Sequence, residues 1–297
     1  MLSRKKLILN DLSGGFDIDI KDFLGGLKEE NGVYYSGKSI PVSYPEYGND
    51  MFYSVEDNSY WFKHRNNCIL ETVRNFCPAG SVFMDVGGGN GFVAKALQDA
   101  GFEAVLIEPG ANGVMNAKKR GVKNIVRASL QDTGIKPGSI PAAGIFDVIE
   151  HIEDDAAFLK MINGYMAPGG RLFVTAPSYN FLWSDEDAEA GHFRRYDAES
   201  LKKALEESGF SVEYSTYFFT FLVVPIALFR VIPYKMGFIK GRKTLKEREA
   251  EHYISGTPAG KIIEMLLDRE IKNIRKLKRN IFGSSCLIAA KKTDIIS

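Results

Sequence analysis

The stretch Phe83–Phe92, FMDVGGGNGF, places an apolar run, an aspartate and four glycines within ten residues. Glycine adopts backbone angles that are closed to other residues and lets a ligand approach the main chain, although each one costs roughly 0.5–1 kcal/mol in conformational entropy. Four glycines directly after a hydrophobic strand therefore predict a turn that binds a ligand.

The sequence around this turn alternates between short strands and amphipathic helices. Buried strands are expected at residues 81–86, 103–109, 124–129, 140–146, 171–177 and 211–218. This alternation predicts an α/β fold with a mostly parallel sheet and crossover helices. Residues 284–292 are expected to form a last strand that returns to the sheet edge. Ligands of open α/β sheets bind outside the carboxyl ends of the strands, where the glycine turn lies.

Composition narrows the functional classes. The chain of 297 residues has 45% hydrophobic residues, which fits one large domain or a domain with a substantial appendage. With 38 basic and 37 acidic side chains, no nucleic-acid partner is expected. Three cysteines form no CxxC pair, and the first residues lack the apolar region of an export signal. These features favour a reduced, cytoplasmic compartment.

Two nucleotide-binding hypotheses compete for the glycine turn. The dinucleotide fingerprint G-x-G-x-x-G requires a third glycine where Phe92 stands. The pattern present is D-x-G-x-G-x-G, made of Asp85, Gly87, Gly89 and Gly91. It resembles the first motif of the class I S-adenosylmethionine-dependent methyltransferases. An acidic strand end suits the cationic ammonium and sulfonium of that cofactor and would repel a pyrophosphate.

The resemblance continues in order from residue 81 to 217. Glu108 and Pro109 end the next strand, where both nucleotide families place an acid that accepts hydrogen bonds from the ribose hydroxyls. The resemblance further implies that Ser129 and Leu130 pack against the adenine. It predicts S-adenosylmethionine as the cofactor, and a Rossmann-like sheet of seven strands with the last strand antiparallel.

Two further residues are expected at the cofactor. Asp147 lies in GIFDVIEHIEDD, which resembles the segment after the fourth strand of the ubiquinone-biosynthesis O-methyltransferases. Arg65 lies in NSYWFKHRNN, before the first strand, where some relatives use an arginine to hold the methionine carboxylate. A guanidinium fork matches a carboxylate in bidentate geometry.

Three neighbouring polar residues raise the question of a metal site. Asp147, Glu150 and His151 resemble a divalent-metal triplet of the ubiquinone-type relatives, and on one helix their spacing would put them on one face. Because methyl transfer does not require a metal, none is expected.

The loop at residues 178–201, SYNFLWSDEDAEAGHFRRYDAESL, is the candidate acceptor site. It resembles the W-S-x-x-D-x-x-x-G-H-x-R-R-Y run of methyltransferases linked to polysaccharide or surface-glycan metabolism. The expected acceptor contacts are Trp183, Asp187, Arg194, Arg195 and Tyr196. A hydroxyl acceptor must lose a proton, commonly to a histidine, and His192 is preferred over His151 as this base.

The sequence thus predicts methyl transfer to a small-molecule acceptor, on oxygen, with a sugar or lipid-linked glycan as the acceptor class. An NAD-dependent oxidoreductase and a non-catalytic S-adenosylmethionine-binding module are the alternatives. The first is disfavoured by Phe92 and Asp85, and the second by the polar groups around His192.

Four regions are expected along the chain. They are an accessory region (1–75), the methyltransferase core (76–217), a helical lid or oligomerisation insertion (218–280), and a last strand and tail (281–297). The apolar stretch 217–238 is interrupted by two prolines, Arg230 and Lys235, so no transmembrane segment is expected. Its composition predicts an apolar lid or a homodimer surface, and is compatible with peripheral membrane contact.

Overall fold

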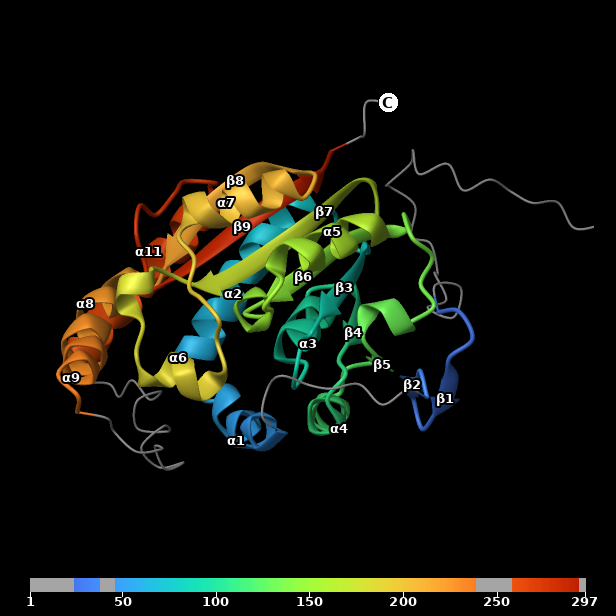
Figure 1. Cartoon of the computed structure of the whole chain (residues 1–297), viewed down its shortest axis with the longest axis horizontal. Helices are drawn as coiled ribbons and strands as arrows, with labels where there is room; N and C mark the ends of the chain where they lie inside the picture. Colours follow the sequence, from blue (N-terminus) through green and yellow to red (C-terminus); the bar gives the residue numbers. More distant parts are fainter. Residues whose placement is uncertain (1–23, 38–45, 239–257, 294–297) are drawn as a thin grey trace, which may run out of the picture.

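The computed structural model describes residues 24–37, 46–238 and 258–293. A central sheet has helices on both faces (Figure 1). Buried side chains of α2 (Tyr60–Phe76), α3 (Phe92–Asp99) and α11 (Pro258–Arg275) share one core with one face of the sheet. Those of α5 (Asp155–Tyr165) and α7 (Ala198–Glu207) share a second core with the opposite face. The predicted α/β architecture is confirmed.

The sheet of the described residues has nine strands in the order β1-β2-β5-β4-β3-β6-β7-β9-β8. Their bounds are β1 Lys28–Glu30, β2 Val33–Tyr35, β3 Val82–Val86, β4 Glu103–Ile107, β5 Asn124–Arg127, β6 Ile140–Phe146, β7 Met166–Pro177, β8 Phe210–Phe218 and β9 Ser285–Lys292. β1 runs antiparallel to β2, and β9 runs antiparallel to both of its neighbours. All seven strands expected from the sequence form, and the last is antiparallel as expected.

The predicted count of seven strands is wrong, because the sheet has two more at one edge. β1 and β2 come from the N-terminal region and extend the sheet beyond β5, with Val33 paired to Ile125. Each strand is three residues long, and the side chains of β1 are exposed. Such short strands carry too little alternation to be recognised from their hydrophobic pattern.

The last strand also lies elsewhere than expected. β9 does not form the sheet edge but lies between β7 and β8, with Ala290 opposite both Leu172 and Val212. The first six residues of β9 are buried. An uninterrupted apolar run such as CLIAA is typical of a strand covered on both faces, which an interior position provides.

The expected helical region is confirmed in its described part. β8 is followed by η5 (Thr220–Leu222), α8 (Val223–Ile226), the π-helical turn η6 (Ala227–Val231) and α9 (Ile232–Lys235), and α11 lies beyond the undescribed residues. Among the described residues no helix is long and apolar enough to cross a membrane. A role for this region as a lid or dimer surface stays a prediction.

Candidate active site

The structure explains why the turn between β3 and α3 contains four glycines. Gly87, Gly89 and Gly91 have φ of +73°, +53° and +70°, in the left-handed region that residues with a side chain rarely adopt. A Cβ on Gly88 would lie 2.4 Å from Asp85 Oδ2. The turn therefore favours glycine at three positions through the backbone angle and at Gly88 through the close approach of Asp85.

Asp85 lies beneath the turn and is fully buried. Neither carboxylate oxygen has a partner among the described residues that meets hydrogen-bond geometry. Burial raises the pKa of Asp85 to about 7, while the positive charge of Arg65 and the nearby N–H of Ala94 lower it. A cationic ligand would compensate the ionised carboxylate. Binding of the cofactor ammonium by Asp85 stays a prediction.

Glu108, which follows β4, links the glycine turn to the neighbouring loop. Its carboxylate accepts hydrogen bonds from the N–H groups of Gly89 at 2.9 Å and Gly110 at 2.6 Å. Burial raises the pKa of Glu108, and these two bonds lower it. A carboxylate offers about four acceptor positions, so two remain for the ribose hydroxyls that the sequence predicts here. Pro109, between these groups, is partly exposed.

Helix α1 (Glu46–Glu56) lies against the glycine turn, which the sequence did not predict. Asn90 of the turn donates to the backbone oxygen of Asn49 at 2.8 Å and to Glu56 Oε1 at 3.2 Å. Glu56 also accepts a 2.6 Å hydrogen bond from Arg120 of α4 (Ala111–Arg120), and both side chains of this pair are buried. No local pattern reveals such contacts, because Glu56 and Arg120 are 64 residues apart.

The third predicted cofactor segment lies in the loop after β5. Ser129 donates to Asp132 at 2.8 Å within the turn η2 (Leu130–Asp132). The Leu130 side chain is buried in the core between the sheet and α5. Contact of Ser129 and Leu130 with adenine stays a prediction. Because the Leu130 side chain is buried in the core, Leu130 would contact the adenine mainly through its backbone.

Arg65 of α2 reaches the carboxyl end of β6. Its Nε donates to Asp147 Oδ2 at 2.5 Å, and its Nη2 donates to the backbone oxygen of Phe146 at 2.8 Å. Asp147 has a φ of +55° and also accepts a hydrogen bond from Thr175 at 3.0 Å. Arg65 and Asp147, both predicted at the cofactor, are thus brought together. Their contact with the cofactor itself stays a prediction.

Asp187 organises the loop after β7. It lies in α6 (Asp185–Ala190), is 1% exposed, and accepts hydrogen bonds from His192 Nδ1 at 2.9 Å and from Arg195 Nε at 2.7 Å. Burial raises the pKa of Asp187, but the bonds from His192 and Arg195 outweigh it and lower the pKa below its usual value. Asp187 and Arg195, predicted to contact the acceptor, are paired with each other inside the loop.

The other predicted acceptor residues hold the loop against the segment after β6. Arg194 Nη1 lies 2.7 Å from Asp155 Oδ2 and its Nη2 donates to the backbone oxygen of Glu153. The buried Tyr196 donates to Asp155 at 2.5 Å. Trp183 is partly buried. Acceptor contacts by these side chains stay predictions, and the pairings of Arg194 and Tyr196 give both a structural role.

The loop brings His192 against His151. Their ring centroids are 4.7 Å apart with an interplanar angle of 78°. Burial, and then the charge of His192, lower the pKa of His151 to about 4. The backbone N–H of Phe193 donates to the backbone oxygen of Glu150 at 2.8 Å, which joins the acceptor loop to the turn η3 (Ile149–His151).

A group that could hold a divalent cation forms here, and its members differ from the triplet Asp147, Glu150 and His151 that resembles a metal site in the sequence. One ligand atom each of Glu150, His151 and His192 lies within 4.8 Å of the others. Asp147 is not one of these three residues, and its carboxylate accepts hydrogen bonds from Arg65 and Thr175 instead. Burial, and then the charge of Asp147, raise the pKa of Glu150 well above its usual value.

A family model described as a methyltransferase domain matches residues 60–215. This chain belongs to the methyltransferase domain family. The predicted S-adenosylmethionine-dependent methyltransferase is thereby confirmed, and the alternative of an NAD-dependent oxidoreductase is set aside.

Relatives of this methyltransferase support the same cofactor. A probable S-adenosylmethionine-dependent methyltransferase of Mycolicibacterium smegmatis is 25% identical over 178 residues, which are 59% of this chain and 68% of that protein. A Mycobacterium tuberculosis protein described in the same way is 23% identical, over 52% of this chain and 57% of its own length. A ubiquinone biosynthesis O-methyltransferase of Xanthomonas axonopodis pv. citri is 25% identical, over 33% of this chain and 44% of its own length. The match with the latter two thus spans about half of each relative.

Solved structures share the fold of this methyltransferase. Phosphoethanolamine N-methyltransferase 2 of Haemonchus contortus, in complex with S-adenosyl-L-methionine, has a TM-score of 0.53 and 17% identity, covering 85% of this chain and 58% of its own. An S-adenosylmethionine-dependent methyltransferase of Thermotoga maritima has a TM-score of 0.50 and 16% identity, covering 83% of this chain and 96% of its own. At these identities the likeness concerns the fold.

Proposed function

We propose that this methyltransferase methylates an oxygen atom of a small-molecule acceptor, with His192 as the general base. The acceptor class is a sugar or a lipid-linked glycan, bound against the loop at residues 178–201. The observation that carries the proposal is the pairing of His192 with the buried Asp187 beside His151.

The pairing gives His192 a defined tautomer. Because the Asp187 carboxylate accepts at Nδ1, the ring keeps its hydrogen on that nitrogen and leaves Nε2 as the proton acceptor. In the reaction the acceptor oxygen forms a bond to the methyl carbon while the methyl–sulfur bond breaks. The sulfonium becomes a neutral thioether, and the hydroxyl proton moves to Nε2. The negative charge of Asp187 stabilises the imidazolium that results.

His192 is a better candidate for this base than His151. A histidine whose pKa is about 4 binds a proton more weakly than an ordinary imidazole, whose pKa is about 6.5. His151 therefore stays neutral during turnover and lines the site. Base catalysis of this kind contributes about 10²–10⁴-fold to the rate, and alignment of the two reactants contributes the larger share of the acceleration.

The test uses labelled S-adenosylmethionine with a panel of monosaccharides, phenols, lipid-linked saccharides and amines. With an accepted substrate, His192→Ala should lower kcat by about 10²-fold or more, and leave the affinity for S-adenosylhomocysteine, measured by calorimetry, unchanged. Free imidazole should restore part of the turnover. Glu189→Ala, at an exposed position of the same helix α6, is the matched control and should match the wild type.

Two outcomes would contradict the proposal. Full turnover by His192→Ala would remove this histidine as the base. Transfer of the label only to nitrogen or carbon acceptors would remove the oxygen specificity. Asp187→Asn adds a third check. It should lower kcat, because the asparagine no longer holds His192 in the orientation that leaves Nε2 free to accept the proton. The Tm of the variant shows whether its folding is also affected.

A further inference from the structure

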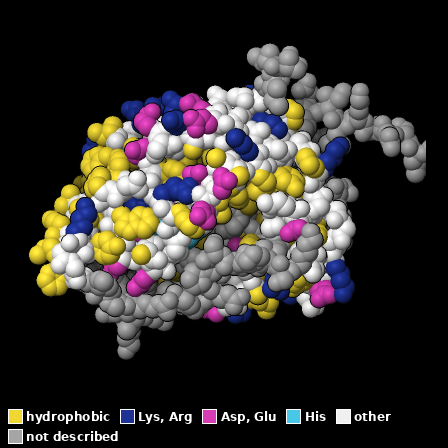
Figure 2. Space-filling view, in the orientation of Figure 1, with side chains coloured by type: hydrophobic (Ala, Val, Ile, Leu, Met, Phe, Trp, Pro, Cys, Tyr) yellow, Lys and Arg dark blue, Asp and Glu magenta, His cyan; other side chains and the backbone are white. Residues whose placement is uncertain are grey.

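The segment after β8 exposes a stripe of large apolar side chains. Val224, Leu228, Ile232 and Met236 recur every fourth residue and are 60%, 51%, 46% and 67% exposed. Phe229, at 67%, lies beside them. We call these five residues the α8–α9 stripe. Hydrophobic side chains gather over α8 and α9 at the left of the molecule in Figure 2. Contiguous apolar patches of this kind mark interaction sites.

The segment that carries the stripe has basic residues but no acidic ones. The sequence from residue 218 to 246 contains six basic residues and no acidic residue, although the whole chain has 38 basic and 37 acidic side chains. Arg230 and Lys235 are the two within the described residues, and the other four lie outside them. Lys235, next to Met236, is exposed. Apolar side chains flanked by cations are typical of helices that lie in the headgroup region of an anionic bilayer.

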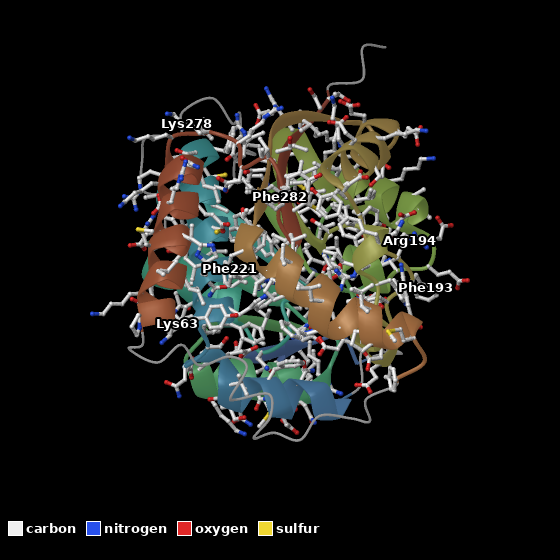
Figure 3. The ribbon with its side chains drawn as sticks, turned by 90° about the vertical axis from the view of Figure 1, so that its left-hand side faces the viewer. Lys63, Phe193, Arg194, Phe221, Lys278 and Phe282 are labelled. Atoms are coloured by element: carbon white, nitrogen blue, oxygen red, sulfur yellow. The ribbon has the colours of Figure 1, made fainter. Side chains whose placement is uncertain are left out.

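The stripe is connected to the candidate acceptor loop. Arg230, in the middle of this helical run, forms an ion pair with Glu186 of α6. In Figure 3 the run crosses the front of the molecule from the labelled Phe221 toward the labelled Phe193, which follows His192 in the loop. Phe193 is itself 49% exposed. A surface that the stripe contacts would therefore lie next to the candidate acceptor loop.

We propose that the α8–α9 stripe docks the enzyme on an anionic membrane surface. A second copy of the chain fits less well, because a symmetric interface over the stripe would bring the exposed Lys235 of both copies into one contact, and like charges repel. An anionic bilayer complements both features, since its acyl boundary takes up the apolar side chains and its headgroups attract the cations.

Docking would select amphiphilic acceptors. The reactive group of such an acceptor would stay at the membrane surface while the enzyme presents the acceptor loop to it. This consequence rests on the proposed function, whereas membrane docking itself does not. Vesicle binding measured without cofactor or acceptor therefore tests docking separately from methyl transfer.

The experiment is sedimentation of the full chain with vesicles. Vesicles of phosphatidylcholine with phosphatidylglycerol should bind the protein, vesicles of phosphatidylcholine alone should bind it more weakly, and salt should reduce binding. Phe229→Glu should lower the partition coefficient by about 10- to 150-fold, since burying such a side chain stabilises by about 1.5–3 kcal/mol. Met115→Glu, at a 50% exposed methionine of α4, is the matched control and should bind like the wild type.

Three results would overturn the proposal. Failure of the wild type to bind anionic vesicles would do so. Equal binding by Phe229→Glu and the wild type, both with unchanged Tm, would remove the stripe from the contact. A dimer in analytical ultracentrifugation that Phe229→Glu converts to a monomer, without vesicle binding, would assign the stripe to a second copy instead.

Discussion

At the scale of single residues, the glycine turn between β3 and α3 combines unusual backbone angles with two buried acids, Asp85 and Glu108. The glycines remove side chains from the turn, and Glu108 holds it to the loop after β4 through Gly89 and Gly110. Asp85 differs, since its buried carboxylate lacks such bonds among the described residues. The two acids therefore differ in their hydrogen bonding, although both follow or end a strand in the sequence. Each leads to its own prediction.

Glu108→Ala should weaken binding of S-adenosylhomocysteine. It removes the predicted bonds to the ribose and the observed bonds to the turn, and a hydrogen bond to a charged group contributes about 1.5–3 kcal/mol, or about 10- to 150-fold in affinity. Calorimetry measures the change. Glu103→Ala, at an exposed position of the same strand, is the control, and an effect of Glu108→Ala no larger than that of the control would refute the role.

Asp85→Asn should change how stability depends on pH. The pKa of Asp85 is about 7 in the folded protein against 3.8 ordinarily, so between these values the folded carboxyl stays protonated while the unfolded one ionises. The wild type should therefore lose stability as pH rises from about 4 to 7, by up to about 4 kcal/mol.

The asparagine variant lacks this titration. In thermal unfolding without cofactor, its Tm relative to the wild type should rise between pH 5 and pH 8. Parallel Tm curves for the two proteins would show that Asp85 does not titrate in this range.

At the scale of elements, the N-terminal region contributes more than an appendage. β1 and β2 extend the sheet at one edge, and α1 covers the glycine turn through Asn49 and Glu56. The buried pair of Glu56 with Arg120 joins α1 to α4. Loss of this ion pair should therefore lower both the free energy of unfolding and the affinity for the cofactor.

Arg120→Met should destabilise the protein strongly. Removing one partner of a buried ion pair costs about 3–5 kcal/mol, whereas replacing both with apolar residues is often close to neutral. We expect the double variant Glu56→Leu, Arg120→Met to recover much of the loss in urea denaturation. Lys203→Met breaks an exposed pair with Glu207 and should cost at most about 1 kcal/mol. Equal losses in Arg120→Met and Lys203→Met would contradict the buried-pair argument.

At the scale of the whole molecule, the fold assembles the candidate active site from distant segments. Arg65 comes from α2, Glu150 and His151 from the turn after β6, and His192 from the loop after β7. The carboxyl ends of parallel strands meet at one edge of a sheet, which is why these segments converge.

Exhaustive treatment with a chelator tests whether the group of Glu150, His151 and His192 acts through a metal. Methyl transfer from a sulfonium needs no metal, so we expect kcat to be unchanged after chelation and gel filtration, while Tm reports folding. Loss of turnover that Mg²⁺ or Zn²⁺ restores would show that the group is an essential metal site, and would exclude His192 as a free base.

Local sequence determined the elements of the core. Alternation between buried runs and amphipathic helices marks β3 through β8, and CLIAA marks β9, because each pattern reports the burial of its own segment. The D-x-G-x-G-x-G turn was recognisable by its resemblance to the first motif of the class I S-adenosylmethionine-dependent methyltransferases, and its glycines adopt the positive φ angles that such a local turn requires. The cofactor class followed from this turn.

Tertiary structure decided which segments meet. The apolar run of β9 did not by itself determine where this strand lies. Only the sheet shows that β9 lies between β7 and β8 and not at the edge. The contact of His192 with His151, and the group that both form with Glu150, depend on how two loops pack, whereas the pairing of His192 with Asp187 forms within one loop. The cover of α1 over the glycine turn likewise joins residues far apart in the chain. Such contacts carry no local periodicity, because their energy arises from burial and charge pairing that exist only after folding.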